Sequence, residues 1–226
     1  MYGDASLSEL YGALTPNGAG AQTLPAGQRS GFLTQAAFLF SAEESTAEHK
    51  IITRGLTVRH RMLCQPPAPP PPNLMPQASD LRPLGDNATP AESYEAFAQS
   101  QPACVGCHAA FHPLGLAFEA YDNVGRYRTQ YDDGREIVTS GELLNAGDAS
   151  GPYQSAVEIA NRIGNSQIGE YCFSRQFAEY SLGRHLHAEL DACIIRAPSD
   201  ASAEPTVQEL AVVLSDVEAG SSRFHQ

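Results

Sequence analysis

Residues 104–121 read Cys-Val-Gly-Cys-His-Ala-Ala-Phe-His-Pro-Leu-Gly-Leu-Ala-Phe-Glu-Ala-Tyr. The first five of these residues form a Cys-x-x-Cys-His motif, the arrangement that attaches a c-type haem. The thiols of Cys104 and Cys107 have the spacing that reaches the two vinyl groups on one edge of a porphyrin. His108 follows them directly and is placed to be the proximal iron ligand. The motif therefore predicts haem c as a cofactor.

The same segment also suits a different metal. Cys104, Cys107, His108 and His112 form a Cys-x2-Cys-His-x3-His pattern of four donors, which could surround a tetrahedral zinc ion. A site with all four ligands would be structural, whereas a site lacking one of them could activate water for hydrolysis. Zinc is therefore the alternative cofactor, and a zinc-binding domain, structural or hydrolytic, is the alternative function.

The sixth ligand of a haem iron is not identified by the sequence. If residues 108–112 are helical, His108 and His112 lie on one face of the helix, whereas the two axial ligands of an iron approach from opposite sides. His112 is then excluded as the sixth ligand. The remaining candidates by residue type are His60, Met62, Met75, His185 and His187.

The rest of the chain predicts a mainly α fold. Apolar residues at helical spacing predict helices over 5–14, 31–42, 51–64, 91–101, 114–121, 153–163, 166–182 and 207–217, with Gly183 as a C-terminal cap. The turn residues Asp132-Asp133-Gly134 predict a β-hairpin within 127–143, and the prolines after Gln65 predict a polyproline strap. The predicted class is a cytochrome c-like helical module with a small hairpin and this strap.

Composition excludes several functions. The chain has 226 residues and a formal net charge of −12, so its field repels phosphate backbones and anionic lipids. We therefore expect no nucleic-acid partner, and no apolar run reaches the ~20 residues of a membrane span. The sequence has no nucleophile elbow, zinc-protease motif or nucleotide-binding glycine loop, so no catalytic residues are assigned beyond the metal motif.

Several blocks of sequence together resemble one protein family. They are residues 31–39, Arg54-Gly55, residues 62–73, the Cys-x-x-Cys-His motif, residues 113–128, residues 140–143 and residues 180–184. In order and spacing they resemble the C-terminal region of large multi-domain proteins of planctomycetes and myxobacteria. In those proteins, modules catalogued as domains of unknown function fifteen-eighty-eight and fifteen-eighty-five accompany cytochrome c domains.

The resemblance implies an exported, haem-associated protein that acts in electron transfer or in oxidation of an external substrate. It implies a periplasmic or cell-surface location, although the chain starts Met-Tyr-Gly-Asp and shows no signal peptide. The expected partners are a redox protein or other domains of the parent chain. The expected organisation is a remnant of a preceding module over 1–23, a helical module over 24–129, and a hairpin with a C-terminal helical module over 130–226.

One position departs from the relatives. In the relatives, the sequence after the haem motif is usually Met-Asp-Pro-Leu-Gly, whereas in this chain it is Phe111-His112-Pro-Leu-Gly. A methionine that could lie near the iron is absent, and a histidine stands beside its place.

Three other side chains could support a bound haem. Arg126 and Arg128 follow the motif closely, and an arginine next to a haem commonly pairs with a propionate, although an ion pair with Asp122 explains Arg126 nearly as well. Glu119 could accept a hydrogen bond from His108, with an exposed carboxylate as the alternative. We include Arg126 among the expected cofactor-binding residues.

The remaining cysteines are expected to be structural. In an exported protein, Cys172 and Cys193 would form a disulfide on either side of Gly183, with two reduced thiols as the alternative. Cys64 is then unpaired and expected to be a small buried apolar residue.

Overall fold

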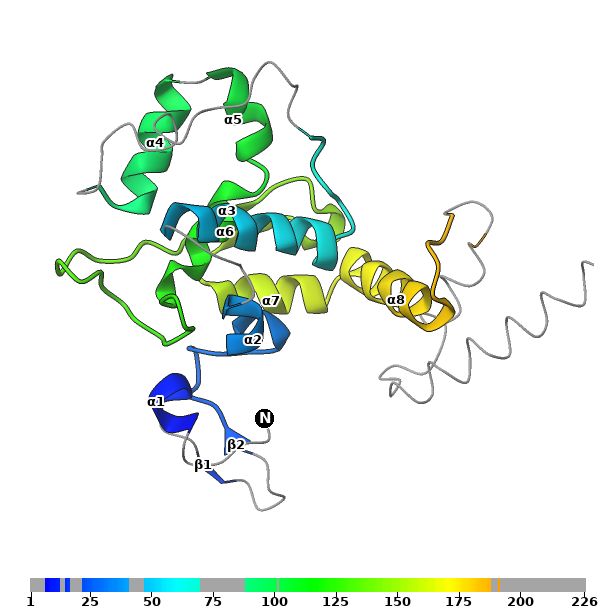
Figure 1. Cartoon of the computed structure of the whole chain (residues 1–226), viewed down its shortest axis with the longest axis horizontal. Helices are drawn as coiled ribbons and strands as arrows, with labels where there is room; N and C mark the ends of the chain where they lie inside the picture. The colour runs from blue at the N-terminus through cyan, green and yellow to red at the C-terminus, as the bar shows by residue number, and fades with distance from the viewer. Residues whose placement is uncertain are drawn as a thin grey trace, which may run out of the picture.

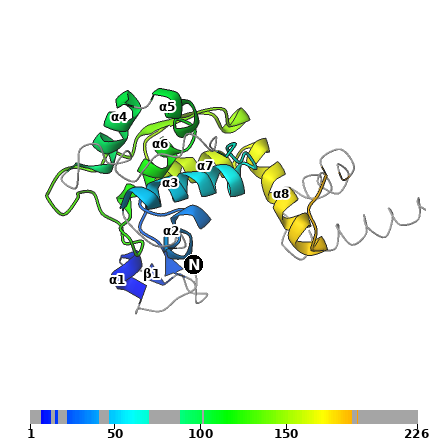
Figure 2. The same ribbon diagram turned by 45° about the horizontal axis from the view of Figure 1, so that its top comes forward.

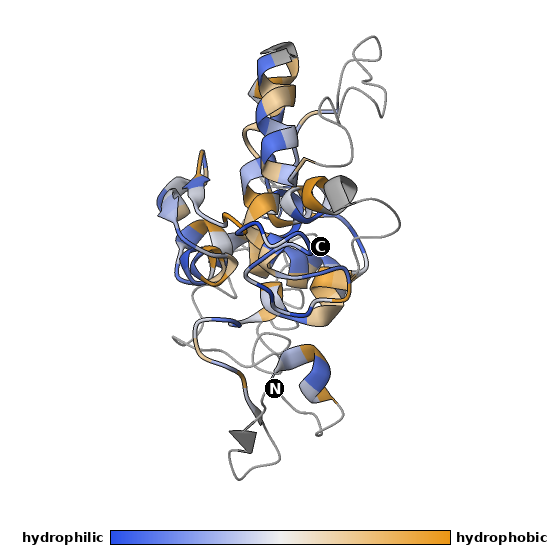
Figure 3. Cartoon of the chain, turned by 90° about the vertical axis from the view of Figure 1, so that its left-hand side faces the viewer, coloured by the Kyte–Doolittle hydropathy of each residue, from blue (hydrophilic) through white to orange (hydrophobic). Residues whose placement is uncertain are grey.

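The computed structural model describes residues 7–12, 15–16, 22–40, 47–69, 88–100, 102–187 and 191. The helix predicted over 207–217 and the candidate ligand Met75 lie outside these residues. The described chain is mainly helical, as the sequence predicts, with two small antiparallel sheets. Figure 3 shows that its helices carry both hydrophobic and hydrophilic residues.

The N-terminal part holds short elements. Helix α1 (Ser8–Tyr11) is followed by strands β1 (Thr15–Pro16) and β2 (Gln22–Thr23), which pair antiparallel. The single helix predicted over 31–42 is instead two pieces, η2 (Phe32–Thr34) and α2 (Ala36–Phe40). Gln35 between them has an extended backbone, and the Tyr11 hydroxyl accepts a hydrogen bond from the Ala36 amide. A long-range contact thus starts a new helix at this point.

The next helix carries much of the core. Helix α3 (Ala47–Thr57) continues directly into a π-helical turn, η3 (Val58–Met62), so the helix predicted over 51–64 is confirmed in place. It ends before Cys64, whose φ of 52° is in the left-handed region. Residues 65–69 follow with no helix or strand, and the rest of the predicted polyproline strap lies outside the described residues.

The middle of the chain forms four consecutive helical segments. They are α4 (Pro90–Ser100), α5 (Pro102–His108), α6 (His112–Leu116) and the 3-10 helix η5 (Ala117–Ala120). In two views, α4 and α5 lie together at one end of the molecule, away from α1 (Figures 1 and 2). The predicted helices over 91–101 and 114–121 are therefore present, the second as two joined segments.

The hairpin prediction is only partly right. The chain does turn at residues 132–134, but it is flanked by a single antiparallel bridge between Gln130 and Glu136 rather than by strands. The sheet forms later, where β3 (Gly141–Leu143) pairs with β4 (Gly151–Tyr153) across the short helix η6 (Gly147–Ala149). Leu143 and Tyr153 of this sheet are buried, so packing onto the core places the strands there.

Two helices complete the described chain. Helix α7 (Ala156–Gly164) and helix α8 (Gln167–Leu182) begin at Ser155 and Ser166, whose hydroxyls accept hydrogen bonds from backbone amides of the first turn. Gly183 has a left-handed conformation at the end of α8, which confirms the predicted cap. Within the described residues, no helix has the length and apolarity required to span a membrane.

Helices α3 and α6 cross at two glycines. A Cβ atom on Gly115 would lie 1.9 Å from the Ile51 carbonyl oxygen, and one on Gly55 would lie 1.9 Å from the Phe111 carbonyl oxygen. Neither distance is compatible with a side chain. The two backbones therefore touch directly, and this contact fixes α6 against α3 at the centre of the molecule (Figure 1).

A buried arginine ties the same region together. Arg54 of α3 is 2% exposed, and its guanidinium donates to the carbonyls of Leu39, Phe118, Tyr121 and Asp122 at 3.0–3.3 Å. Arginine has five donors in a rigid fork, so one side chain can satisfy several carbonyls at helix ends. Arg54 thus connects α2, α3 and the end of η5.

Two further arginines act in the same way. Arg59 of η3 donates to the carbonyls of Ala110 and Leu144, and Arg29 donates to those of Thr34 and Leu10. Burial lowers the pKa of both guanidinium groups, yet arginine stays charged in proteins. Backbone carbonyls thus provide the polar surroundings of these buried charges.

One core joins the two halves of the chain. Buried residues of a single cluster come from before and after residue 130, among them Phe38, Leu114, Phe118, Ile159 and Ile163. The boundary expected between 129 and 130 stays a prediction, and the described residues on its two sides pack against each other.

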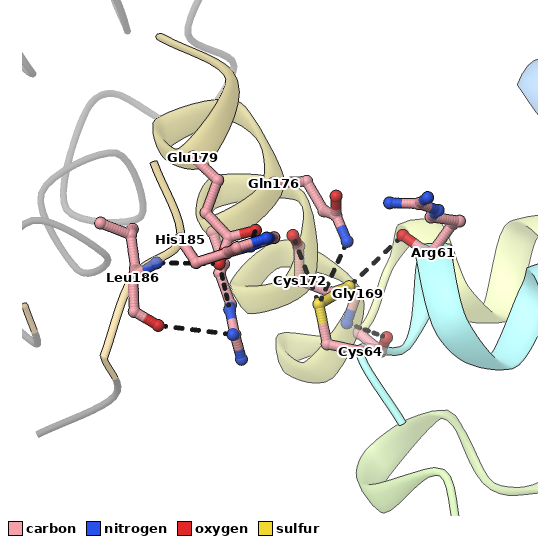
Figure 4. Close-up of a disulfide and its surroundings, with 10 residues drawn as sticks. Arg61, Cys64, Gly169, Cys172, Gln176, Glu179, His185 and Leu186 are labelled. Carbon is pink, nitrogen blue, oxygen red and sulfur yellow. Dashed lines mark hydrogen bonds and ion pairs between the residues drawn. A yellow bond between two sulfur atoms is a disulfide. The ribbon is translucent and has the colours of Figure 1, made fainter. Parts of the chain in front are cut away.

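The disulfide is different from the one predicted. Cys64 pairs with Cys172, 108 residues away, with a Cα–Cα distance of 5.4 Å (Figure 4). The predicted pairing of Cys172 with Cys193 is therefore wrong, as is the expectation of an unpaired Cys64. The reason is tertiary: α8 packs against η3, which places Cys172 beside Cys64, two residues after the end of η3.

Gly115→Ala should destabilise the fold by about 3 kcal/mol, because the new methyl group would overlap the Ile51 carbonyl. Urea unfolding followed by circular dichroism measures this change. Gly164→Ala is the matched control: it lies at the end of α7, and an added Cβ meets no atom within 4 Å. An equal decrease in the free energy of unfolding in the two variants would contradict the close crossing of α3 and α6.

Candidate functional site

Helix α4, whose Tyr94 and Phe97 contact the histidines of the site, begins with two capping hydrogen bonds. The Thr89 amide donates to the Glu92 carboxylate at 2.7 Å, and the Glu92 amide donates to the Thr89 hydroxyl at 3.2 Å. This is a capping box, with Pro90 at the first helical position, where it needs no amide partner. Glu92 also pairs with Arg135 at 2.7 Å, which connects α4 to the loop after η5.

The two cysteines of the motif lie on the short helix α5. Cys104 and Cys107 are three residues apart, so their side chains are neighbours on one face of the helix. Both are free thiols; Cys104 is half-buried and Cys107 is exposed. They are therefore not joined to each other, and both remain available for bonds to a bound group.

His108 ends α5 and is surrounded by rings. Its imidazole lies 4.8 Å from the Phe97 ring and 4.9 Å from the Phe111 ring, measured between centroids. Burial lowers its pKa below the ordinary histidine value, which favours the neutral imidazole that binds metals. Neither aromatic residue was assigned to the site from the sequence; the helical spacing of α4 only marked Phe97 as apolar.

His112, at the start of α6, is the more deeply buried histidine. It is 6% exposed, and its ring stacks on Tyr94 with centroids 3.9 Å apart. Burial, followed by the charge of His108, lowers its pKa to about 3. The Nδ1 atoms of His108 and His112 lie 3.4 Å apart. Residues 109–111 between them form a turn rather than a helix, so the two imidazoles face each other.

The four predicted zinc ligands do not form a metal cluster. His108 and His112 are in contact, but no group of three or more histidine, cysteine or acidic side chains suited to a metal occurs among the described residues. The zinc alternative gains no support from this geometry.

The charged residues after the motif form ion pairs. Arg126 lies 3.8 Å from the Asp122 carboxylate and its side chain is largely exposed, as the alternative interpretation of the sequence expects. Glu119 is buried, so the alternative of an exposed carboxylate does not hold. Its carboxylate forms an ion pair with Arg128 at 3.3 Å. The suggested roles of Arg126 toward a propionate and of Glu119 toward His108 stay predictions.

Four of the five candidates for a sixth ligand lie within the described residues. His60, His185 and His187 are exposed, and Met62 is half-buried against the core. Met62 also lines an apolar groove of about 960 Å³ together with Phe32 and Phe173, both exposed. This groove is not predictable from the sequence, because its lining residues come from segments far apart in the chain.

The site therefore belongs to a mainly helical domain whose Cys-x-x-Cys-His motif closes one helix and whose next helix is fixed in the core. Residues 29–131 match the model of PSCyt3, a protein family of unknown function (DUF1588), and this part of the chain belongs to that domain family. The matched region includes the whole motif. No curated protein and no solved structure matches the chain.

The low pKa of His112 predicts a loss of stability in acid. Below pH 6.5 the unfolded chain binds a proton at this histidine that the folded chain excludes down to about pH 3. The free energy of unfolding should therefore fall by up to about 1.4 kcal/mol for each pH unit in this range. His112→Phe removes the titrating group and should flatten the dependence.

Urea unfolding of the unloaded protein at about pH 7 and about pH 5 checks this prediction. From about pH 7 to about pH 5, the free energy of unfolding of the native chain should fall by about 2 kcal/mol more than that of His112→Phe. His60→Ala, at an exposed histidine, is the control and should behave like the native chain. Parallel losses in the native chain and His112→Phe would show that His112 titrates normally.

Proposed function

We propose that this chain is a c-type haem-binding electron-transfer module of a larger exported protein. Cys104 and Cys107 would hold the haem through thioether bonds, and His108 would be the proximal ligand. The observation that carries the proposal is the arrangement of α5: two free thiols on one face of a helix, followed by an imidazole held between aromatic rings.

The thiols fit covalent attachment without a further reagent. In each thioether bond, the sulfur adds to one carbon of a vinyl group and the thiol hydrogen goes to the other carbon, so the double bond becomes single. Nothing is oxidised or reduced overall. Both sulfurs are free for this addition, and the Cys107 thiol is exposed to solvent, where a ligand can reach it.

The surroundings of His108 fit a metal ligand. Phe97 and Phe111 restrict its ring, and burial favours its neutral form, which offers one lone pair to iron. When bound, haem iron supplies a reversible one-electron couple, whose potential depends on axial ligation and burial. The residues of α4, α5 and α6 contribute position and partial exclusion of water.

Two observations support an exported protein. The Cys64–Cys172 disulfide is typical of oxidising compartments such as the periplasm or the cell surface. The name PSCyt3 is compatible with an association with cytochromes, which operate in the same compartments when their haem is covalently attached. The electron partner would be another domain of the parent chain or a separate redox protein, and the net charge of −12 favours a basic surface on it.

The test is to export the chain in a bacterium that attaches haem to c-type cytochromes and to record absorbance and a pyridine haemochrome spectrum. We expect one haem per chain that remains bound after denaturation and acidic organic extraction. Replacing Cys104 and Cys107 together by serine should abolish covalent haem, whereas Cys193→Ser removes a cysteine outside the motif and should retain it.

A colourless protein from that host would contradict the proposal. So would haem that is extracted from the denatured native chain, because thioether bonds survive this treatment. One equivalent of zinc without haem, measured by elemental analysis, would favour the alternative instead.

A further inference from the structure

Two histidines of unequal burial face each other at the proposed site. His108 is half-buried at the end of α5, and its Nδ1 atom lies 3.4 Å from Nδ1 of His112 at the start of α6. This distance is at the long end of hydrogen-bond range. Two neutral imidazoles so placed form one hydrogen bond, in which one Nδ1 carries the proton and the other accepts it.

His112 is the fixed member of the pair. Its ring is stacked on Tyr94, it is followed by Pro113, and it opens the helix that crosses α3 at Gly115. The turn before it is held by Arg59, which donates to the Ala110 carbonyl at 2.7 Å. The position of the His112 ring is therefore determined by the core rather than by the motif.

We propose that His112 is a positioning residue that accepts a hydrogen bond from Nδ1–H of His108. This assignment, which rests on the proposed function, places the proton of His108 on Nδ1 and leaves the lone pair of Nε2 for iron. The opposite direction would protonate Nε2 of His108 and block its use as a ligand. Metal-binding histidines generally donate their second ring nitrogen to a carboxylate, a backbone carbonyl or water, which fixes the tautomer and makes the ligand more basic. Here the acceptor would be Nδ1 of His112.

The reduction potential of the haem-loaded protein tests the role of His112. His112→Phe keeps a ring against Tyr94 and removes the acceptor, so His108 becomes a weaker electron donor and the potential should shift to a more positive value. His112→Asn retains an acceptor oxygen close to the position of Nδ1 and should restore a potential near that of the native chain. Spectroelectrochemical titration measures all three.

An unchanged potential in His112→Phe would overturn the proposal. Equal shifts in His112→Phe and His112→Asn would also overturn it, because they would show that the hydrogen-bond acceptor retained in His112→Asn has no effect on the potential. His225→Ala, at a histidine that is not among the candidate ligands, controls for removal of a histidine elsewhere. Covalent haem content is recorded for each variant, so that loss of attachment is not mistaken for a change in potential.

A second measurement does not need haem and separates the two proposals. Long-range proton–nitrogen NMR of the unloaded chain identifies the tautomer of His108. The native chain and His112→Asn should show the proton on Nδ1, whereas His112→Phe should shift it toward Nε2. A native chain that carries no haem but shows the Nδ1–H tautomer would reject the proposed function alone. A native chain that shows the Nε2–H tautomer would reject the role of His112.

Discussion

The structure depends on the direct contact of two helix backbones where Gly115 of α6 meets Ile51 of α3 and Gly55 of α3 meets Phe111. Close crossing removes the space that side chains would fill, so α6 has one position relative to α3. His112 is the first residue of α6, so the contact between α3 and α6 also determines where His112 lies. The candidate site is thus located by the packing of α3 and α6, although the motif itself lies on α5, the short helix before α6.

Buried positive charge is the second constraint. Arg54 and Arg59 both lie on the α3–η3 segment and donate to carbonyls at the ends of other segments, among them Ala110 in the turn between His108 and His112. A buried guanidinium without such partners would cost several kcal/mol. The carbonyls need donors as well, because helix ends leave them unpaired. One segment of the chain therefore fixes the turn that separates the two histidines.

Local chemistry made much of the fold predictable. The end of α8 at Gly183 follows from residues adjacent in the chain, and so does the Cys-x-x-Cys-His motif at the end of α5. The features that were missed depend on distant segments. The break at Gln35 involves Tyr11, and the Cys64–Cys172 disulfide requires α8 to pack on η3. No periodicity in the sequence reports such contacts.

The same distinction applies to the site. The sequence supplied the cysteines and both histidines, but not the 3.4 Å contact between the imidazoles or the stacking of Tyr94, since α4 and α6 are separated by α5. It also offered four zinc ligands with suitable spacing, which the described structure does not bring together. Spacing specifies which residues are adjacent, whereas the tertiary fold decides which of them meet.

The most direct test of this account is a map of the cysteines in the matured, exported protein by mass spectrometry without reduction. The account predicts that the peptide containing Cys104 and Cys107 carries one covalently bound haem and that the peptides of Cys64 and Cys172 are joined by a disulfide. If Cys104 and Cys107 are instead free to react with an alkylating reagent, or are bonded to each other, the account is contradicted.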